Sequence, residues 1–200
     1  MHSNSNSKAK IGLALVLSLS IFATGCSAQW VNVALADLPV LTQMALNIAA
    51  MVATLQSGKQ ASAAELAAVQ NISAEASKDL TLLHTFYNDY KASPSADAMQ
   101  KIENVIADIN QNLPALLQAA HISDPTLAAR VTAGVNLILT TVSSFASLIP
   151  QPAAPSTALK TRQNIVIPKA EELRKQWNQQ VCAPTGNSAL DAALTTCALR

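Results

Sequence analysis

Apolar residues recur at intervals of three and four along most of the chain, which is the spacing of one face of an α-helix. This pattern predicts a first helix over residues 37–58, with Asp37 as its N-cap and Gly58 just beyond its end. A second helix begins with a capping box formed by Ser62 and Glu65, and it ends before the Ser-Pro-Ser sequence at residues 93–95.

Two further helices follow with the same periodicity. The third carries its apolar residues between Met99 and Leu116, and we expect a kink near Pro114 because proline has no backbone N–H. The fourth starts at Asp124 and keeps heptad-like apolar steps as far as Ile149. Because long helices joined by short connections pack against their neighbours, the sequence predicts an all-α fold, an up-down-up-down four-helix bundle over residues 37–150.

The last fifty residues have a different pattern. Residues 151–168 are rich in proline and alanine and predict an extended linker. A charged helix is expected from Lys169 to Val181, and a shorter one is expected after it with Ser188 as N-cap. Together they predict a C-terminal helical hairpin over residues 169–200.

The cysteines of this hairpin form an even pair once Cys26 is set aside. In a compartment that supports disulfides, Cys182 and Cys197 are expected to pair and to staple the hairpin, and the alternative is two unpaired thiols. Their spacing is not that of a CxxC motif and no histidine lies near either, so neither a zinc site nor haem attachment is predicted.

The N-terminus has the pattern of an export signal. Residues 1–10 are polar and carry two lysines, and the uncharged apolar residues 11–24 are too few to span a bilayer comfortably. The segment ends in the sequence ATGC at residues 23–26, which resembles the lipobox of bacterial lipoprotein precursors. The resemblance covers only these first 26 residues and departs from the commonest pattern in having Ala23 where leucine usually stands.

This resemblance implies a signal peptide over residues 1–25, lipidation of Cys26 and a membrane-proximal tether over residues 26–36. Because Ser27 replaces the aspartate that retains many such lipoproteins on the inner membrane, it also implies the periplasmic face of the outer membrane. Several acyl chains would hold the protein there permanently, and Trp30 is then expected at the membrane interface. The alternative is an ordinary signal peptide that is cut nearby.

Two uncharged stretches, residues 38–56 and 131–149, are long enough to raise the question of membrane insertion. In the second stretch the polar residues fall on a stripe opposite the apolar one, which favours a half-solvated helix. These polar residues are Thr132, Asn136, Thr140, Ser143 and Ser147. A bundle outside the membrane is therefore expected, with a membrane-inserting helical protein as an alternative.

Charge is sparse and unevenly distributed. Charged residues make up 12% of the chain, which argues against nucleic acid as a partner. Residues 27–150 hold nine acidic and five basic residues, whereas residues 151–200 hold three acidic and six basic ones. The helix around Trp177, with Lys169, Arg174 and Lys175, is either docked on an acidic partner or anionic headgroups, or simply solvated.

Candidate chemistry is limited to one cluster. His84, Tyr87 and Tyr90 lie within two helical turns and form a candidate ligand pocket. The favoured interpretation is that the tyrosines are core residues whose hydroxyls reach water and that His84 lies at the surface or boundary. The Glu-x-x-His, Gly-x-Ser-x-Gly and His-Glu-x-x-His motifs and a glycine-rich phosphate loop are all missing from the sequence. We therefore expect no catalytic residues, no metal site and no cofactor.

The leading hypothesis is a lipid-anchored, non-enzymatic scaffold or protein-interaction module with an envelope protein as its partner. One alternative is a carrier that holds a small apolar ligand in the bundle core. Another is a metal or redox function that uses His84 or the cysteine pair.

Overall fold

The computed structural model describes residues 29–51, 62–149, 168–186 and 188–200. No strand occurs in these residues, which confirms the all-α prediction. The first helix, α1, is described over Gln29–Met51. The other elements are α2 (Ala63–Ala92), α3 (Ala96–Ala119), α4 (Pro125–Leu148), α5 (Ala170–Gln180), α6 (Ser188–Leu194) and the 3₁₀ turn η1 (Thr195–Cys197).

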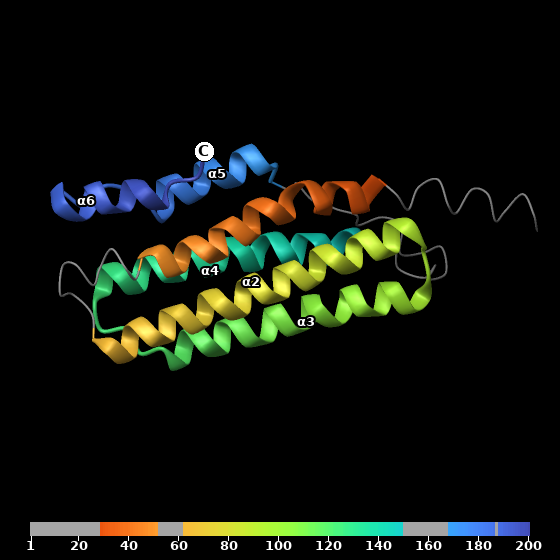
Figure 1. Cartoon of the computed structure of the whole chain (residues 1–200), viewed down its shortest axis with the longest axis horizontal. Coiled ribbons are helices and arrows are strands. Elements are labelled where there is room, and N and C mark those ends of the chain that lie inside the picture. Colours follow the sequence, from red (N-terminus) through yellow and green to blue (C-terminus); the bar gives the residue numbers. More distant parts are fainter. Residues whose placement is uncertain (1–28, 52–61, 150–167, 187) are drawn as a thin grey trace, which may run out of the picture.

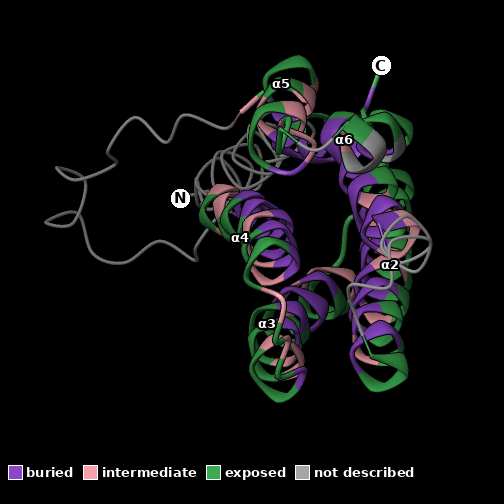
Figure 2. Ribbon diagram, turned by 90° about the vertical axis from the view of Figure 1, so that its left-hand side faces the viewer, coloured by how far each residue is buried: buried purple, intermediate pink, exposed green. Residues whose placement is uncertain are grey.

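Helices α1 to α4 run alternately in opposite directions and form the expected bundle (Figure 1). The described part of residues 169–200, which we call the C-terminal layer, lies along α1 and α4 on the side of the bundle farthest from α3 (Figures 1 and 2). Buried residues face inward on every helix of the bundle (Figure 2). The chain therefore adds a further helical layer to one side of a four-helix bundle.

The helix starts predicted for the second and fourth helices are confirmed. The Ser62 hydroxyl accepts from the backbone N–H of Glu65 at 3.2 Å, and the Glu65 carboxylate accepts from the backbone N–H of Ser62 at 2.7 Å. The Asp124 carboxylate caps α4, with Pro125 in the first turn, where its missing N–H costs nothing. Short polar sequences thus set these boundaries.

The apolar stripes predicted for the second and fourth helices are buried along their whole length. On α2 they are Leu66, Val69, Ile72, Ala76, Leu80, Leu83, Tyr87 and Tyr90. On α4 and just after it they are Leu127, Val131, Val135, Ile138, Val142, Phe145 and Ile149. The third helix runs through Pro114 to Ala119 as one element. Burial of these stripes is the main force that holds the bundle together.

The start of the first helix differs from the prediction. Residues 29–36, expected to be part of a tether, are already helical, and Asp37 lies inside α1 instead of at its N-cap. These residues carry an apolar face of their own, because Trp30, Val31 and Ala34 are buried. Packing of that face outweighs the preference of aspartate for a cap position. The same packing places Trp30 in the core of the bundle, so the membrane-interface position expected for Trp30 is wrong.

Some expected features lie outside the described residues. These are the signal segment with Cys26, the end of the first helix near Gly58 and almost all of the linker at 151–168.

Helices α1 and α4 are long and apolar enough to cross a membrane by length and composition alone. However, 50% of the apolar window in α1 and 44% of that in α4 are buried inside the bundle. The predicted polar stripe of α4 is exposed at Asn136, Thr140 and Ser143. This division into a buried and a polar face is typical of helices in water-soluble bundles.

Candidate functional site

The C-terminal layer is fixed to the bundle by Trp177, which is fully buried. Its indole Nε1 donates to the backbone carbonyl of Cys197 at 2.9 Å. The ring lies against Gly134 of α4, where a Cβ would approach the ring carbon Cζ3 to 3.0 Å. Glycine at this position therefore lets α5 approach α4 closely. A helix of 11 residues is marginal by itself, so α5 depends on this packing.

Charged side chains from the bundle hold both ends of α5. At its N-terminus, where α5 has no side-chain cap of its own, the buried Asp37 carboxylate accepts the backbone N–H of Ala170. At its C-terminus the Arg130 guanidinium donates to the backbone carbonyls of Val181 and Ala183, the latter at 2.6 Å. An acid at the N-terminus and a base at the C-terminus match the helix dipole. Burial raises the pKa of Asp37, and the bond from Ala170 opposes this shift.

Two side-chain amides fix the last residues of the chain. Asn47 of α1 donates to the carbonyl of Cys197 at 2.8 Å and accepts from Gln43 at 2.9 Å. Asn178 of α5 donates to the carbonyl of Leu199 at 2.9 Å and accepts its N–H at 2.8 Å. The residues after η1 are therefore held in place although they are not helical.

An open groove of about 520 Å³ lies between α1, α5 and this final segment, and we call it the basic groove. It is lined by Pro39, Val40, Gln43, Asn47, Arg174, Thr195, Thr196, Ala198, Leu199 and Arg200. Neither Arg174 nor Arg200 forms an ion pair with any residue that the structure describes. Lys175, next to Arg174 on α5, instead pairs with Glu172 at 3.9 Å. The groove lining therefore contains two positive side chains and no negative one.

The cysteine pair lies in the same layer. Both residues are thiols in this structure, Cys197 buried and Cys182 half-buried. Burial, and next the charge of the neighbouring Cys197, raises the pKa of the Cys182 thiol to about 11. The disulfide between the two residues therefore stays a prediction. At neutral pH the Cys182 thiol therefore holds little of the thiolate that metals bind.

The structure separates the members of the candidate pocket at His84, Tyr87 and Tyr90. Tyr87 is fully buried and packs edge-on against Trp30, with ring centroids 5.5 Å apart, and against Phe145 at 6.3 Å. Tyr90 packs against the same Trp30 at 5.7 Å. His84 is only half-buried, and its ring Nδ1 lies 3.3 Å from the amide of Asn88. The tyrosines are thus part of an aromatic core, and their role in ligand binding stays a prediction.

Two polar atoms inside this aromatic core have no hydrogen-bond partner, the Trp30 Nε1 and the Tyr87 hydroxyl. Burial raises the pKa of Tyr87 above its ordinary value, so the hydroxyl stays protonated.

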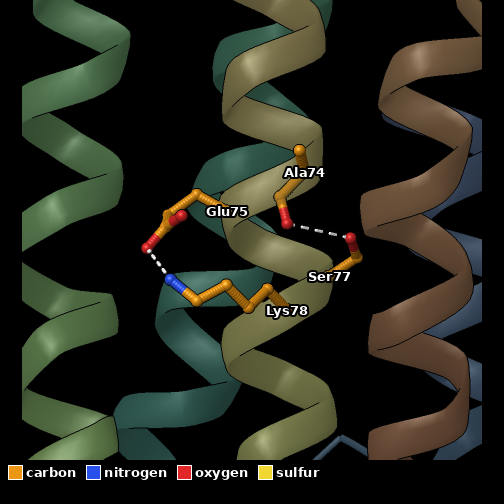
Figure 3. A network of polar contacts seen from close by, with 4 residues as sticks. All are labelled: Ala74, Glu75, Ser77 and Lys78. Carbon is orange, nitrogen blue, oxygen red and sulfur yellow. Dashed lines mark hydrogen bonds and ion pairs between the residues drawn. The ribbon is translucent and has the colours of Figure 1, made fainter.

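A second cluster of titratable side chains lies on α2, at residues 75–79. Glu75 pairs with Lys78 at 2.8 Å on the surface, and Ser77 donates to the Ala74 carbonyl beside them (Figure 3). The neighbouring Asp79 is buried, and one of its carboxylate oxygens has no partner. Burial, followed by the charge of Glu75, raises its pKa. Among the described residues, no three His, Cys, Asp or Glu side chains are grouped so that they could hold a metal ion.

Sequence analysis singled out the helix around Trp177 but missed the bundle residues that receive it. Asp37 is predicted as a helix cap, Asn47 is predicted only as a polar residue on the first helix, and the sequence assigns no role to Arg130. Arg130 and Asn47 interrupt otherwise apolar or small-residue stretches. A polar residue inside an apolar stripe is often paired when buried, and that signal points to both residues without identifying their partners.

Comparison with known proteins adds no further constraint, since the chain matches no family model, no curated protein and no solved structure.

Proposed function

We propose that the protein is a lipid-anchored, non-enzymatic interaction module of the bacterial cell envelope, and that the basic groove is where it contacts a protein partner. The lipobox-like sequence ending at Cys26 supports the anchor and the periplasmic face of the outer membrane as its location. The helical bundle supports a scaffold role, because it presents a rigid surface on well-packed elements.

The observation that carries this proposal is the construction of the groove. Its walls are held by Asn47 and Asn178, which fix the non-helical final segment against α1 and α5. A surface whose shape is set before binding loses less conformational entropy when a partner docks. Neither of its two arginines forms an ion pair among the described residues, so a partner could bind them without breaking an existing ion pair.

The position of the groove along α1 also suits a tethered protein. The groove begins at Pro39, ten residues after Gln29, and reaches Asn47. At 1.5 Å per residue this places the groove about 15 to 27 Å along α1 from Gln29. If α1 points away from the membrane in a protein anchored at Cys26, this distance would carry the groove beyond the headgroup region, where another envelope protein can reach it.

The proposal is tested by the intact mass of the protein extracted gently from its own membranes, first under native and then under denaturing conditions. We expect a denatured mass that starts at Cys26 with added acyl chains, and a native mass that includes a second protein. A Cys26→Ser variant should lack the acyl chains. An unlipidated mass would remove the anchor, and a native mass without any partner protein would contradict the interaction role.

A further inference from the structure

We infer that the basic groove binds an acidic segment of a protein partner, with carboxylates placed on Arg174 and Arg200. This inference rests on the proposed function and specifies the chemistry of the partner.

Charge complementarity is the first reason. The groove lining combines two guanidinium groups with no acidic side chain. The planar guanidinium presents paired N–H donors that match the two oxygens of a carboxylate. Among the described residues, Glu172 of α5 pairs with Lys175, and neither arginine of the groove lining forms an ion pair, so both guanidinium groups are available to a carboxylate.

The polarity and openness of the groove are the second reason. The apolar residues Val40 and Leu199 are buried, whereas Gln43, Thr195 and Arg200 are exposed in the groove lining. Sites for small apolar ligands are typically enclosed and lined mainly by hydrophobic side chains. A polar, open lining therefore favours a solvated acidic segment over an apolar ligand.

The third reason is the fixed wall formed by the end of the chain. Ala198 has an extended backbone, with φ of −68° and ψ of 137°. Asn178 binds both the N–H and the carbonyl of the next residue, Leu199. The exposed Arg200 follows directly and lines the same groove as Arg174, and the residue before it is held by two hydrogen bonds.

The experiment is selection of peptides from a random heptapeptide library displayed on phage, with the full mature protein as bait. We expect the selected peptides to be enriched in aspartate and glutamate over the starting library. In a titration, Arg174→Gln and Arg200→Gln should each weaken binding of a selected peptide up to about fivefold, as expected for partly exposed ion pairs, and the double variant should weaken it further.

Lys175→Gln is the matched control, because it removes the same charge from the adjacent position of α5 without altering the groove lining. It should leave binding of the selected peptide unchanged. Equal weakening by Lys175→Gln and Arg174→Gln would show a general charge effect and overturn the inference. Selected peptides that are not acidic, or no selection at all, would overturn it too.

Vesicles of phosphatidylglycerol provide the remaining arm, since an anionic lipid surface also attracts arginines. If the delipidated protein floats with these vesicles and the double arginine variant does not, the ligand of the groove is a lipid headgroup and the inference of an acidic protein segment is overturned. If the native mass shows a bound protein while the library yields no acidic peptides, the inference fails and the proposed function stands.

Discussion

Replacement of Trp177 by alanine should detach the C-terminal layer and leave the bundle folded. Trp177 is fully buried, and truncation of a buried tryptophan to alanine costs about 3 to 5 kcal/mol. Its hydrogen bond to the Cys197 carbonyl contributes about 1 kcal/mol more. That carbonyl keeps a second donor, Asn47, so the variant does not leave it unsatisfied. The expected total is about 4 to 6 kcal/mol.

Amide hydrogen exchange measures this effect locally. A loss of that size should reduce the protection of α5 by roughly a thousandfold or more, provided that the layer opens separately from the bundle. Protection of α2 and α3 should stay unchanged, because the hydrogen bond of the indole and its contact at Gly134 involve neither helix. Trp177→Phe keeps most of the apolar contact and should reduce the protection of α5 far less.

Gln179→Ala is the control, because Gln179 is an exposed residue of the same helix. It should leave the exchange pattern intact. Unchanged protection of α5 in Trp177→Ala, or an equal loss over the whole chain, would refute the view that Trp177 docks a separate layer.

Further predictions concern buried polar groups and the thiols. Tyr87→Phe removes an unpartnered buried hydroxyl, so chemical denaturation should show unchanged stability or a gain of up to about 1 kcal/mol. Burial raises the pKa of Asp79, so the protonated carboxyl is favoured in the folded state. This stabilisation is complete below pH 3.8 and is lost as the pH rises through the folded-state pKa of Asp79. Asp79→Asn removes the buried charge and should therefore raise the Tm at neutral pH. Hydrogen bonds from Ser123 and Ser62 lower the pKa of Glu65 from 4.5 to about 2. Their contribution to folding stability is therefore present above pH 4.5 and is lost as the pH falls toward 2. Glu65→Gln should lower the Tm at neutral pH and remove this dependence of stability on acid. Under oxidising conditions, a bond between Cys182 and Cys197 should remove two hydrogens from the mass and stabilise the protein by about 3 kcal/mol, and an unchanged mass would contradict the pairing.

The bundle could be predicted from the sequence because its helices have local signals that agree with one another. The capping box at Ser62 and the proline after Asp124 mark helix starts, and the apolar stripes that follow are the ones that are buried. Such signals lie within a few residues of the feature they determine. A single sequence is therefore enough to read them.

The docking of the C-terminal layer could not be predicted in the same way. The bonds of Asn47 and Arg130 reach residues 150 and 51 positions away along the chain. No local pattern identifies such a partner, because the pairing depends on how α1, α4 and α5 pack. The same reason explains Asp37, whose cap-like character was evident but whose partner is a different helix.

The basic groove could be predicted only in part from the sequence. Arg174 was noted as part of a charged helix, but Arg200 joins it only through the fold, since 26 positions separate them. The charge contrast between the two parts of the chain was the usable signal.

Site-specific photocrosslinking in living cells tests the proposed interaction most directly. A benzophenone amino acid would replace Gln43, which is exposed in the groove lining, or Gln100, which is exposed on α3. We predict a crosslinked envelope protein from position 43 that disappears when Arg174 and Arg200 are both changed to glutamine, and none from position 100. Equal crosslinking from both positions, or crosslinking that survives loss of both arginines, would contradict the assignment of the groove as the partner site.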